Sequence, residues 1–211
     1  SVNIAHNAGI SGEQLKKDWE TIIDGVAGPK IQLLYLGHNN LVETPAYEKL
    51  NKMVKLSLLD LQYNKLETIH PFGKEVHIVK CYLDYNKLKS IPHAADGFFF
   101  GYNGETETIS CNHNEIELFP DVFNAKSNYI ISSISFAYNK ITGFENGDAH
   151  KGVNTSSIDL SYNKLETFPA VLVAKGSPLN TLTLAGNGMK SIPKGSMTGP
   201  KSKMIQVLDL S

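Results

Sequence analysis

The chain has 211 residues, of which 41% are hydrophobic, and its formal net charge is −1 at pH 7. This near balance excludes a general attraction for nucleic acid or for an anionic membrane, because counterion release needs a concentrated set of lysines and arginines. No run of about 18 or more apolar residues is present, so we expect no transmembrane helix and no insertion into a membrane.

The first predicted element is an amphipathic helix that begins after residue 11. The spacing of Ser11 and Gln14 matches a capping box, in which each side chain bonds to the backbone of the other residue. Apolar residues then recur at helical spacing on one face, which we expect to be buried. That face consists of Leu15, Trp19, Ile22, Ile23 and Val26, and Gly25, Gly28 and Pro29 are expected to end the helix.

From Leu34 onwards one pattern, apolar-x-apolar-x-x-Asn-x-apolar, occurs seven times. The alternation at its start predicts a short strand with one buried face, and stacked copies would form a parallel sheet. Val2 to Asn7 and Val207 to Ser211 match parts of the same pattern, so we expect both ends to be cut from a longer array. The asparagines recur every 22 to 28 residues, as Asn39, Asn64, Asn86, Asn114, Asn139, Asn163 and Asn187.

The pattern resembles the leucine-rich repeat family, and the resemblance extends to Ile91-Pro92, Phe119-Pro120, Phe168-Pro169 and Ile192-Pro193. It implies an α/β solenoid, a right-handed superhelix with a concave parallel β-sheet and a convex side of short helices, 3₁₀ turns and loops. We assign one domain, 1–211. It comprises a partial first repeat with the helix (1–30), seven repeats (31–203) and the start of a further, truncated repeat (204–211).

Short return segments connect the predicted strands. Helical turns are predicted at 46–52, with Tyr47 and Leu50 pointing inward, and at 170–174. The stretch 145–154 has no apolar anchor and predicts a return loop, whose Asp148 and His150 are too few for a metal site.

The longest interval contains the insertion HAADGFFFGYNGET. Its aromatic residues either fill the convex core or protrude as a binding loop, and burial is favoured because exposed aromatic runs are costly. These residues are Phe98, Phe99, Phe100 and Tyr102.

The asparagines are predicted to be structural. A tight turn after each strand leaves backbone groups without sheet partners, and a buried carboxamide can donate and accept at once. Replacing a central member, Asn114, by leucine should leave several buried groups unpaired, at roughly 1 to 3 kcal/mol each. Cys81 and Cys111 occupy different inward positions of adjacent strands, which predicts two buried thiols instead of a disulfide.

Outward residues of the strands are the candidates for function, because a solenoid presents them as one continuous surface. Large and acidic residues gather in the N-terminal repeats, whereas the central repeats carry small serines, Ser133 and Ser135, at the equivalent positions. The residue before each asparagine is nearly always aromatic, and both stacking along the sheet edge and recognition remain open for it. The predicted partner-binding residues are Tyr35, Asp60, Tyr63, Tyr82, Asp84, Tyr85, Ser110, His113 and Asp159.

These residues favour a non-enzymatic module that binds a protein through its concave face, as leucine-rich repeat proteins commonly do. Two alternatives are a glycan-binding surface, in which tyrosine rings face sugars, and an architectural spacer in a larger surface protein. No cofactor is expected. The family resemblance implies an extracellular or cell-surface location, with the cytoplasm as the alternative.

Two further kinds of site are disfavoured. Catalysis by Ser110, His113 and Asp84 would lack the strained elbow and the oxyanion donors that acyl transfer needs. Calcium binding by Asp60, Asp84 and Asp159 would offer too few ligands. A basic row after the asparagines, Lys65, Lys87, Lys140 and Lys164, is interpreted as a solvated edge.

Overall fold

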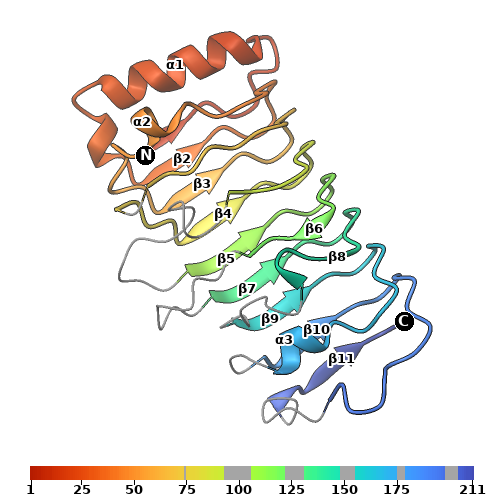
Figure 1. Ribbon diagram of the computed structural model, residues 1–211. Helices are drawn as coiled ribbons and strands as arrows, with labels where there is room; N and C mark the ends of the chain where they lie inside the picture. Colours follow the sequence, from red (N-terminus) through yellow and green to blue (C-terminus); the bar gives the residue numbers. More distant parts are fainter. Residues whose placement is uncertain (74, 93–105, 122–130, 148–154, 175–178, 198–203) are drawn as a thin grey trace.

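Nine parallel strands form one continuous sheet in the computed structural model, which describes residues 1–73, 75–92, 106–121, 131–147, 155–174, 179–197 and 204–211 (Figure 1). The parallel solenoid expected from the repeat pattern is confirmed. The strands, in their order across the sheet, are β1 (Val2–Asn3), β2 (Leu33–Tyr35), β3 (Leu58–Asp60), β4 (Lys80–Tyr82), β5 (Thr106–Ser110), β7 (Ile131–Ser135), β9 (Thr155–Asp159), β10 (Thr181–Thr183) and β11 (Val207–Asp209).

The register places equivalent residues of successive repeats side by side. Leu34 lies beside Leu59, Leu59 beside Cys81, and Cys81 beside Ile109, and all four side chains are fully buried. Because side chains alternate between the two faces of a strand, the residues between these positions point to the exposed face. One buried column per inward position therefore runs the length of the sheet.

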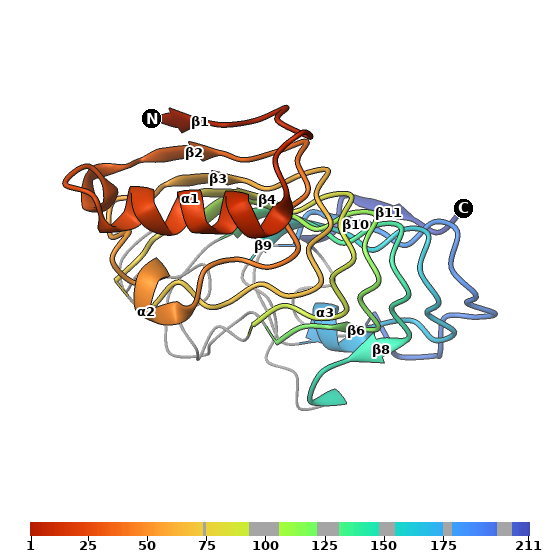
Figure 2. The same cartoon turned by 90° about the horizontal axis from the view of Figure 1, so that it is seen from above.

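Helix α1 (Gly12–Asp24) lies across the N-terminal end of the stack of strands (Figure 2). Leu15, Trp19 and Ile23 are fully buried on its inner face. Val26 is 89% exposed, so its predicted burial was wrong. The reason is that the helix ends at Asp24 and its C-cap residue Gly25 has an extended backbone, so residue 26 no longer follows the helical face.

The capping box predicted for α1 is only half formed. The Ser11 side chain accepts a hydrogen bond from the backbone N–H of Gln14 at 3.2 Å. The Gln14 side chain instead donates to Asp18 at 2.8 Å, one helical turn further along. Ser11 thus caps the helix without the reciprocal bond.

Short elements occupy the return side, opposite the sheet (Figure 2). The helix predicted at 170–174 is confirmed as α3 (Ala170–Ala174). The turn predicted at 46–52 contains α2 (Tyr47–Leu50), and a 3₁₀ helix spans Gly28–Lys30. Leu50 is fully buried as expected, but Tyr47 is 42% exposed, because Leu50 and Met53 already fill the inward places.

A second, two-stranded parallel sheet lies on the return side and was not predicted. It pairs β6 (Leu118–Phe119) with β8 (Gly143–Phe144). The Phe119 ring packs against Phe136 at 5.2 Å and Phe144 at 5.3 Å between centroids. These contacts anchor the pair of strands to the core.

Three other expectations concern buried thiols, membrane helices and loops. Cys81 and Cys111 are free and buried, as predicted, and burial raises the pKa of both thiols well above the usual value. Within the described ranges, none of the helices has the length and apolar character needed to cross a bilayer.

The predictions for Phe98, Phe99, Phe100 and Tyr102, and for Asp148 and His150, fall outside the described residues. The repeat boundaries at 30 and 203 stay predictions.

Candidate functional site

The asparagines form a ladder of hydrogen bonds just beyond the strands. The Asn114 carboxamide accepts from the backbone N–H of Leu88 in the preceding repeat at 3.0 Å. Its nitrogen lies 2.9 Å from the Leu83 carbonyl oxygen and 3.2 Å from that of Cys111. The same bonds to neighbouring repeats recur at Asn39, Asn64, Asn86, Asn139, Asn163 and Asn187.

Except for Leu184 at the C-terminal end, which accepts from Asn187, the carbonyl oxygens in this ladder have two amide donors each. The Leu83 oxygen also accepts from Asn86, and the Cys111 oxygen also accepts from Asn139. Removing the Asn114 side chain would therefore deprive only the Leu88 N–H of its hydrogen-bond partner, whereas the sequence led us to expect several unpaired groups. Sharing between repeats lowers the cost of losing one member.

A second row of polar side chains satisfies the backbone where each strand ends. The carboxylate of Asp60 accepts from the N–H of Gln62 at 3.1 Å, and that of Asp159 accepts from Ser161 at 2.9 Å. Such bonds to the residue two positions on are Asx turns. Asn3 and Asp209 make the same bond. Two predicted contact residues, Asp60 and Asp159, thus also have a structural role.

Asp84 lies two residues beyond this row, after β4, and bridges to the next repeat. Its carboxylate accepts from the Ser110 hydroxyl at 2.7 Å and from the N–H of Asn112 at 2.6 Å. The Asn112 side chain in turn accepts from Ser135 at 2.6 Å. Asp84 and Ser110 are only 7% and 9% exposed, so they support the surface and offer a partner little area.

Burial raises the pKa of Asp84, and the hydrogen bonds from Ser110 and Asn112 oppose that shift. Because the folded-state pKa lies above the unfolded value, the folded state binds the proton more tightly. The contribution of this group to stability is therefore most favourable below the unfolded pKa. It declines as the pH rises through the folded pKa.

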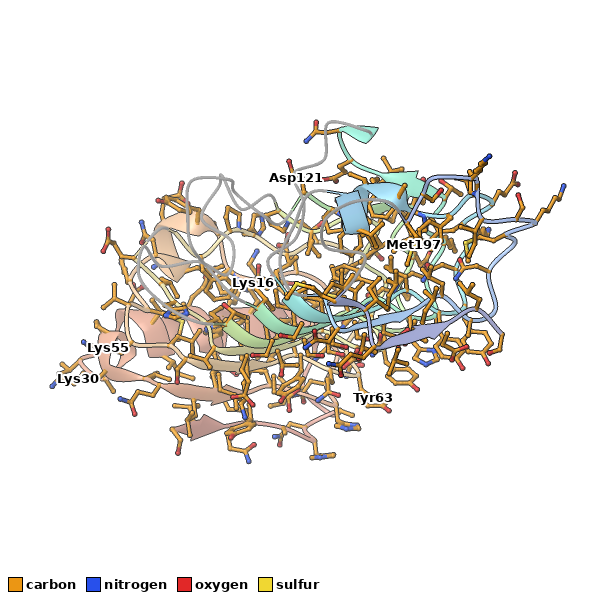
Figure 3. All side chains as sticks on the ribbon, turned by 90° about the horizontal axis from the view of Figure 1, so that it is seen from below. Lys16, Lys30, Lys55, Tyr63, Asp121 and Met197 are labelled. Atoms are coloured by element: carbon orange, nitrogen blue, oxygen red, sulfur yellow. The ribbon has the colours of Figure 1, made fainter. Side chains whose placement is uncertain are left out.

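The aromatic residues before the asparagines form one continuous stack, called the aromatic stack here. Neighbouring ring centroids are 4.1–4.4 Å apart, with interplanar angles of 8–15°. Figure 3 shows Tyr63 projecting from the sheet into solvent, on the opposite side of the molecule from Asp121. The members are His6, His38, Tyr63, Tyr85, His113, Tyr138 and Tyr162.

Every member of the aromatic stack has a left-handed backbone, with φ between +53° and +63°. This conformation is uncommon for residues other than glycine. It turns the chain sharply after the strand and places the following asparagine in the core. The same residues therefore form both the aromatic stack and the turns that follow the strands.

Gly186 follows Tyr162 in this column and has no ring to add. Its φ is +66°, and a Cβ atom there would lie 2.6 Å from Cδ1 of Tyr162. The Tyr162 ring therefore lies over the glycine backbone, and the aromatic stack ends at this position.

The remaining outward positions differ along the sheet. On β2, β3 and β4 the half-buried side chains include Leu33, Leu58, Tyr35, Asp60 and Tyr82. Tyr35 and Tyr82 flank Asp60 in register. On β7, β9 and β10 the equivalent positions carry Ser133, Ser135, Ser157, Asp159, Thr181 and Thr183.

The arrangement of Ser110, His113 and Asp84 differs from a catalytic triad. Ser110 donates directly to Asp84, while the His113 ring is held between Tyr85 and Tyr138 at 4.1 and 4.3 Å. Nor do the described residues contain a group of three histidine, cysteine or acidic side chains that could hold a metal ion. Asp60 and Asp159 lie on β3 and β9, which are not neighbours in the sheet.

The lysine row lies beside the aromatic stack and is exposed at Lys65, Lys87, Lys140 and Lys164. Lys140 pairs with Glu115 at 2.8 Å and lowers the pKa of that carboxyl group. Sequence reasoning did not identify Asn3 and Asp209 as residues that cap their own turns. The signal that could have found them is an Asx residue on, or just after, the strand that precedes a tight turn.

Comparison with known proteins places the fold in a family. No protein-family model matches the chain. The chain is 30% identical to mouse lumican and 28% identical to human lumican over 114 residues, 53% of this chain and 31% of each relative. A leucine-rich repeat protein of Leptospira interrogans, at 18% identity and a TM-score of 0.63, shares the fold.

Two Bacteroides crystal structures match almost the whole chain. The leucine-rich repeat protein of Bacteroides eggerthii DSM 20697 has a TM-score of 0.89 and 39% identity, over 99% of this chain and 35% of its own. That of Bacteroides thetaiotaomicron VPI-5482 has a TM-score of 0.90 and 41% identity, over 100% of this chain and 26% of its own. With its stacked parallel strands and its asparagine ladder, the chain is a leucine-rich repeat protein.

Proposed function

We propose that the chain is a non-enzymatic binding module that recognises a protein through the exposed, concave face of its sheet. Leucine-rich repeat arrays generally mediate protein binding. The observation that carries the proposal is the contrast along the outward positions. Apolar or aromatic side chains occupy four of the six outward positions of β2, β3 and β4, whereas serine or threonine occupies five of the six equivalent positions of β7, β9 and β10.

The chemistry of the N-terminal strands suits a protein partner. Tyrosine buries a large area with few rotatable bonds, and aromatic residues are enriched among the residues that dominate interface energy. Tyr35 and Tyr82 stand on either side of the Asp60 carboxylate, and Leu33 and Leu58 lie beside them. A partner that contributes apolar side chains and a basic group would complement this patch.

We assign the other predicted contacts different roles. Tyr63, Tyr85 and His113 would meet a partner through their exposed ring edges, because stacking covers their faces. Sugar recognition by tyrosine would need an open ring face, so a glycan is the less favoured ligand for these stacked rings. Asp159 would contribute at the periphery, and Asp84 and Ser110 would hold the surface in place.

The test compares two double variants of the chain. Tyr35→Ala with Tyr82→Ala removes the proposed hot spot, and Thr181→Ala with Thr183→Ala alters the equivalent positions on β10. The wild-type chain is first screened against a displayed library of extracellular protein domains and, in parallel, against a glycan array. Affinities of the selected binders are then measured for both variants.

We expect the tyrosine pair to weaken binding of a selected protein by roughly 10-fold or more, because truncating a hot-spot residue typically costs above about 1 kcal/mol. The threonine pair should leave it unchanged. Equal binding by both variants would contradict the proposed site. Binding of glycans without proteins would contradict the proposed partner class.

We further propose that the module acts at the cell surface or outside the cell. This proposal rests on the family resemblance. Protease treatment of intact cells that produce the full-length protein should remove the repeat array. Protection until the cells are lysed would refute the location.

A further inference from the structure

The aromatic stack contains two pairs of neighbouring tyrosines. Tyr63 and Tyr85 have ring centroids 4.3 Å apart at an interplanar angle of 9°. Tyr138 and Tyr162 have centroids 4.4 Å apart at 10°. All four side chains are between 42% and 51% exposed. Each pair therefore combines close contact between two phenols with access from solvent.

The neighbouring phenol also raises the pKa of one tyrosine in each pair. Burial first, and then the charge and hydrogen bonding of Tyr85, raise the pKa of Tyr63. The same causes act on Tyr138 through Tyr162. Tyr63 and Tyr138 therefore hold their hydroxyl protons more tightly than a free phenol does.

We propose that each pair is a site of oxidative coupling to dityrosine, with a peroxidase and hydrogen peroxide as the one-electron oxidising system. Each phenol loses one electron and its hydroxyl proton and becomes a phenoxyl radical. The two radicals form a carbon–carbon bond between positions ortho to their oxygens. The hydrogen atoms on those carbons then return to the oxygens. In sum, two phenols lose two hydrogen atoms and one hydrogen peroxide becomes two waters.

The geometry makes the coupling local. The two residues of a pair belong to adjacent repeats, whose paired strands are about 4.8 Å apart. The ring torsion of tyrosine is broad and two-fold, so each ring can turn about its Cβ–Cγ bond. Coupling requires both rings to leave their parallel stacking and to turn their ortho carbons toward each other.

The surroundings make the coupling selective. His113 lies between Tyr85 and Tyr138, so the two pairs are separated by a ring that cannot form dityrosine. Tyr35 and Tyr82 lie on β2 and β4, with β3 between them. Two cross-links are therefore expected among the described tyrosines, one joining β3 to β4 and one joining β7 to β9.

The experiment treats the full chain with a plant peroxidase and hydrogen peroxide, and follows dityrosine fluorescence. Trypsin cleaves after Lys65, Lys80, Lys140 and Lys151, among other sites, so the four tyrosines lie on four different peptides. Mass spectrometry should find two cross-linked peptide pairs, each lighter than the sum of its members by two hydrogen atoms. Fragment spectra then locate the bond, since Tyr82 shares a peptide with Tyr85, and Tyr129 shares one with Tyr138.

Three variants separate this proposal from random oxidation. Tyr85→Phe should remove the first cross-link and keep the second, and Tyr162→Phe should do the reverse, because phenylalanine preserves the stacked ring. His113→Tyr should add couplings to Tyr85 or Tyr138. The proposal is overturned if the cross-links join different molecules, if Tyr35, Tyr47 and Tyr82 couple equally well, or if the urea-unfolded chain gives the same products.

Discussion

Replacing Asn114 by leucine tests the hydrogen-bond sharing in the asparagine ladder. The Leu83 and Cys111 carbonyl oxygens keep their bonds to Asn86 and Asn139 at 3.0 and 2.9 Å. The Leu88 N–H, 3.0 Å from the Asn114 side chain, loses its hydrogen-bond partner. One buried amide without a partner costs about 1 to 3 kcal/mol. We expect Asn114→Leu to destabilise the fold by that amount, and not by a multiple of it.

Asn187→Leu is the matched control. Asn187 makes equivalent bonds, to Leu160, Leu184 and the N–H of Leu165, but it is only half-buried. Its loss would also deprive the Leu184 carbonyl oxygen of its amide donor, but water can reach this half-buried position and replace these bonds, so the loss should cost less. Urea unfolding measures both variants, and amide exchange should accelerate at Leu88 in the first and at Leu165 in the second. Equal shifts of the urea midpoint, or no shift for Asn114→Leu, would refute the reasoning.

Three other predictions concern single residues. Asp84→Asn keeps the hydrogen-bond acceptor and removes the buried charge. The stability of this variant relative to wild type should therefore rise as the pH increases through the folded-state pKa of Asp84. A stability difference that does not vary with pH in urea titrations would contradict this. Gly186→Ala should cost about 1 to 2 kcal/mol, and less in a Tyr162→Ala background, as a double-mutant cycle would show. Trp19→Ala should destabilise the fold by about 3 to 5 kcal/mol in thermal unfolding, whereas Val26→Ala should have almost no effect. Similar losses of stability in the two variants would mean that α1 does not pack on the core as described.

The strands and their register could be predicted because the alternation of apolar residues leaves one way to bury them. Leu34, Leu59 and Cys81 fall into one column as soon as the repeats are aligned. The pairing of β6 with β8 could not be predicted, since neither segment has a pattern of its own and both depend on Phe119 packing.

The candidate site was harder to predict than the fold. The burial of Asp84 depends on the direction that the chain takes after β4, which the residue type does not reveal. For the aromatic column, stacking and recognition both remained open, because a tyrosine at such a position can serve as a contact residue or as part of the repeat structure. In the structure, the residues whose rings stack on each other all have a left-handed backbone.

The asparagine ladder also has a consequence for how such a chain can change over time. Each carboxamide connects its own turn to the turn before it, so one residue inserted between a strand and its asparagine would misalign bonds in two repeats at once. The return segments carry no such constraint, and the asparagine intervals already range from 22 to 28 residues. A lineage can therefore lengthen the return side freely, but it can alter the exposed face of the sheet only by substitution or by gaining and losing whole repeats.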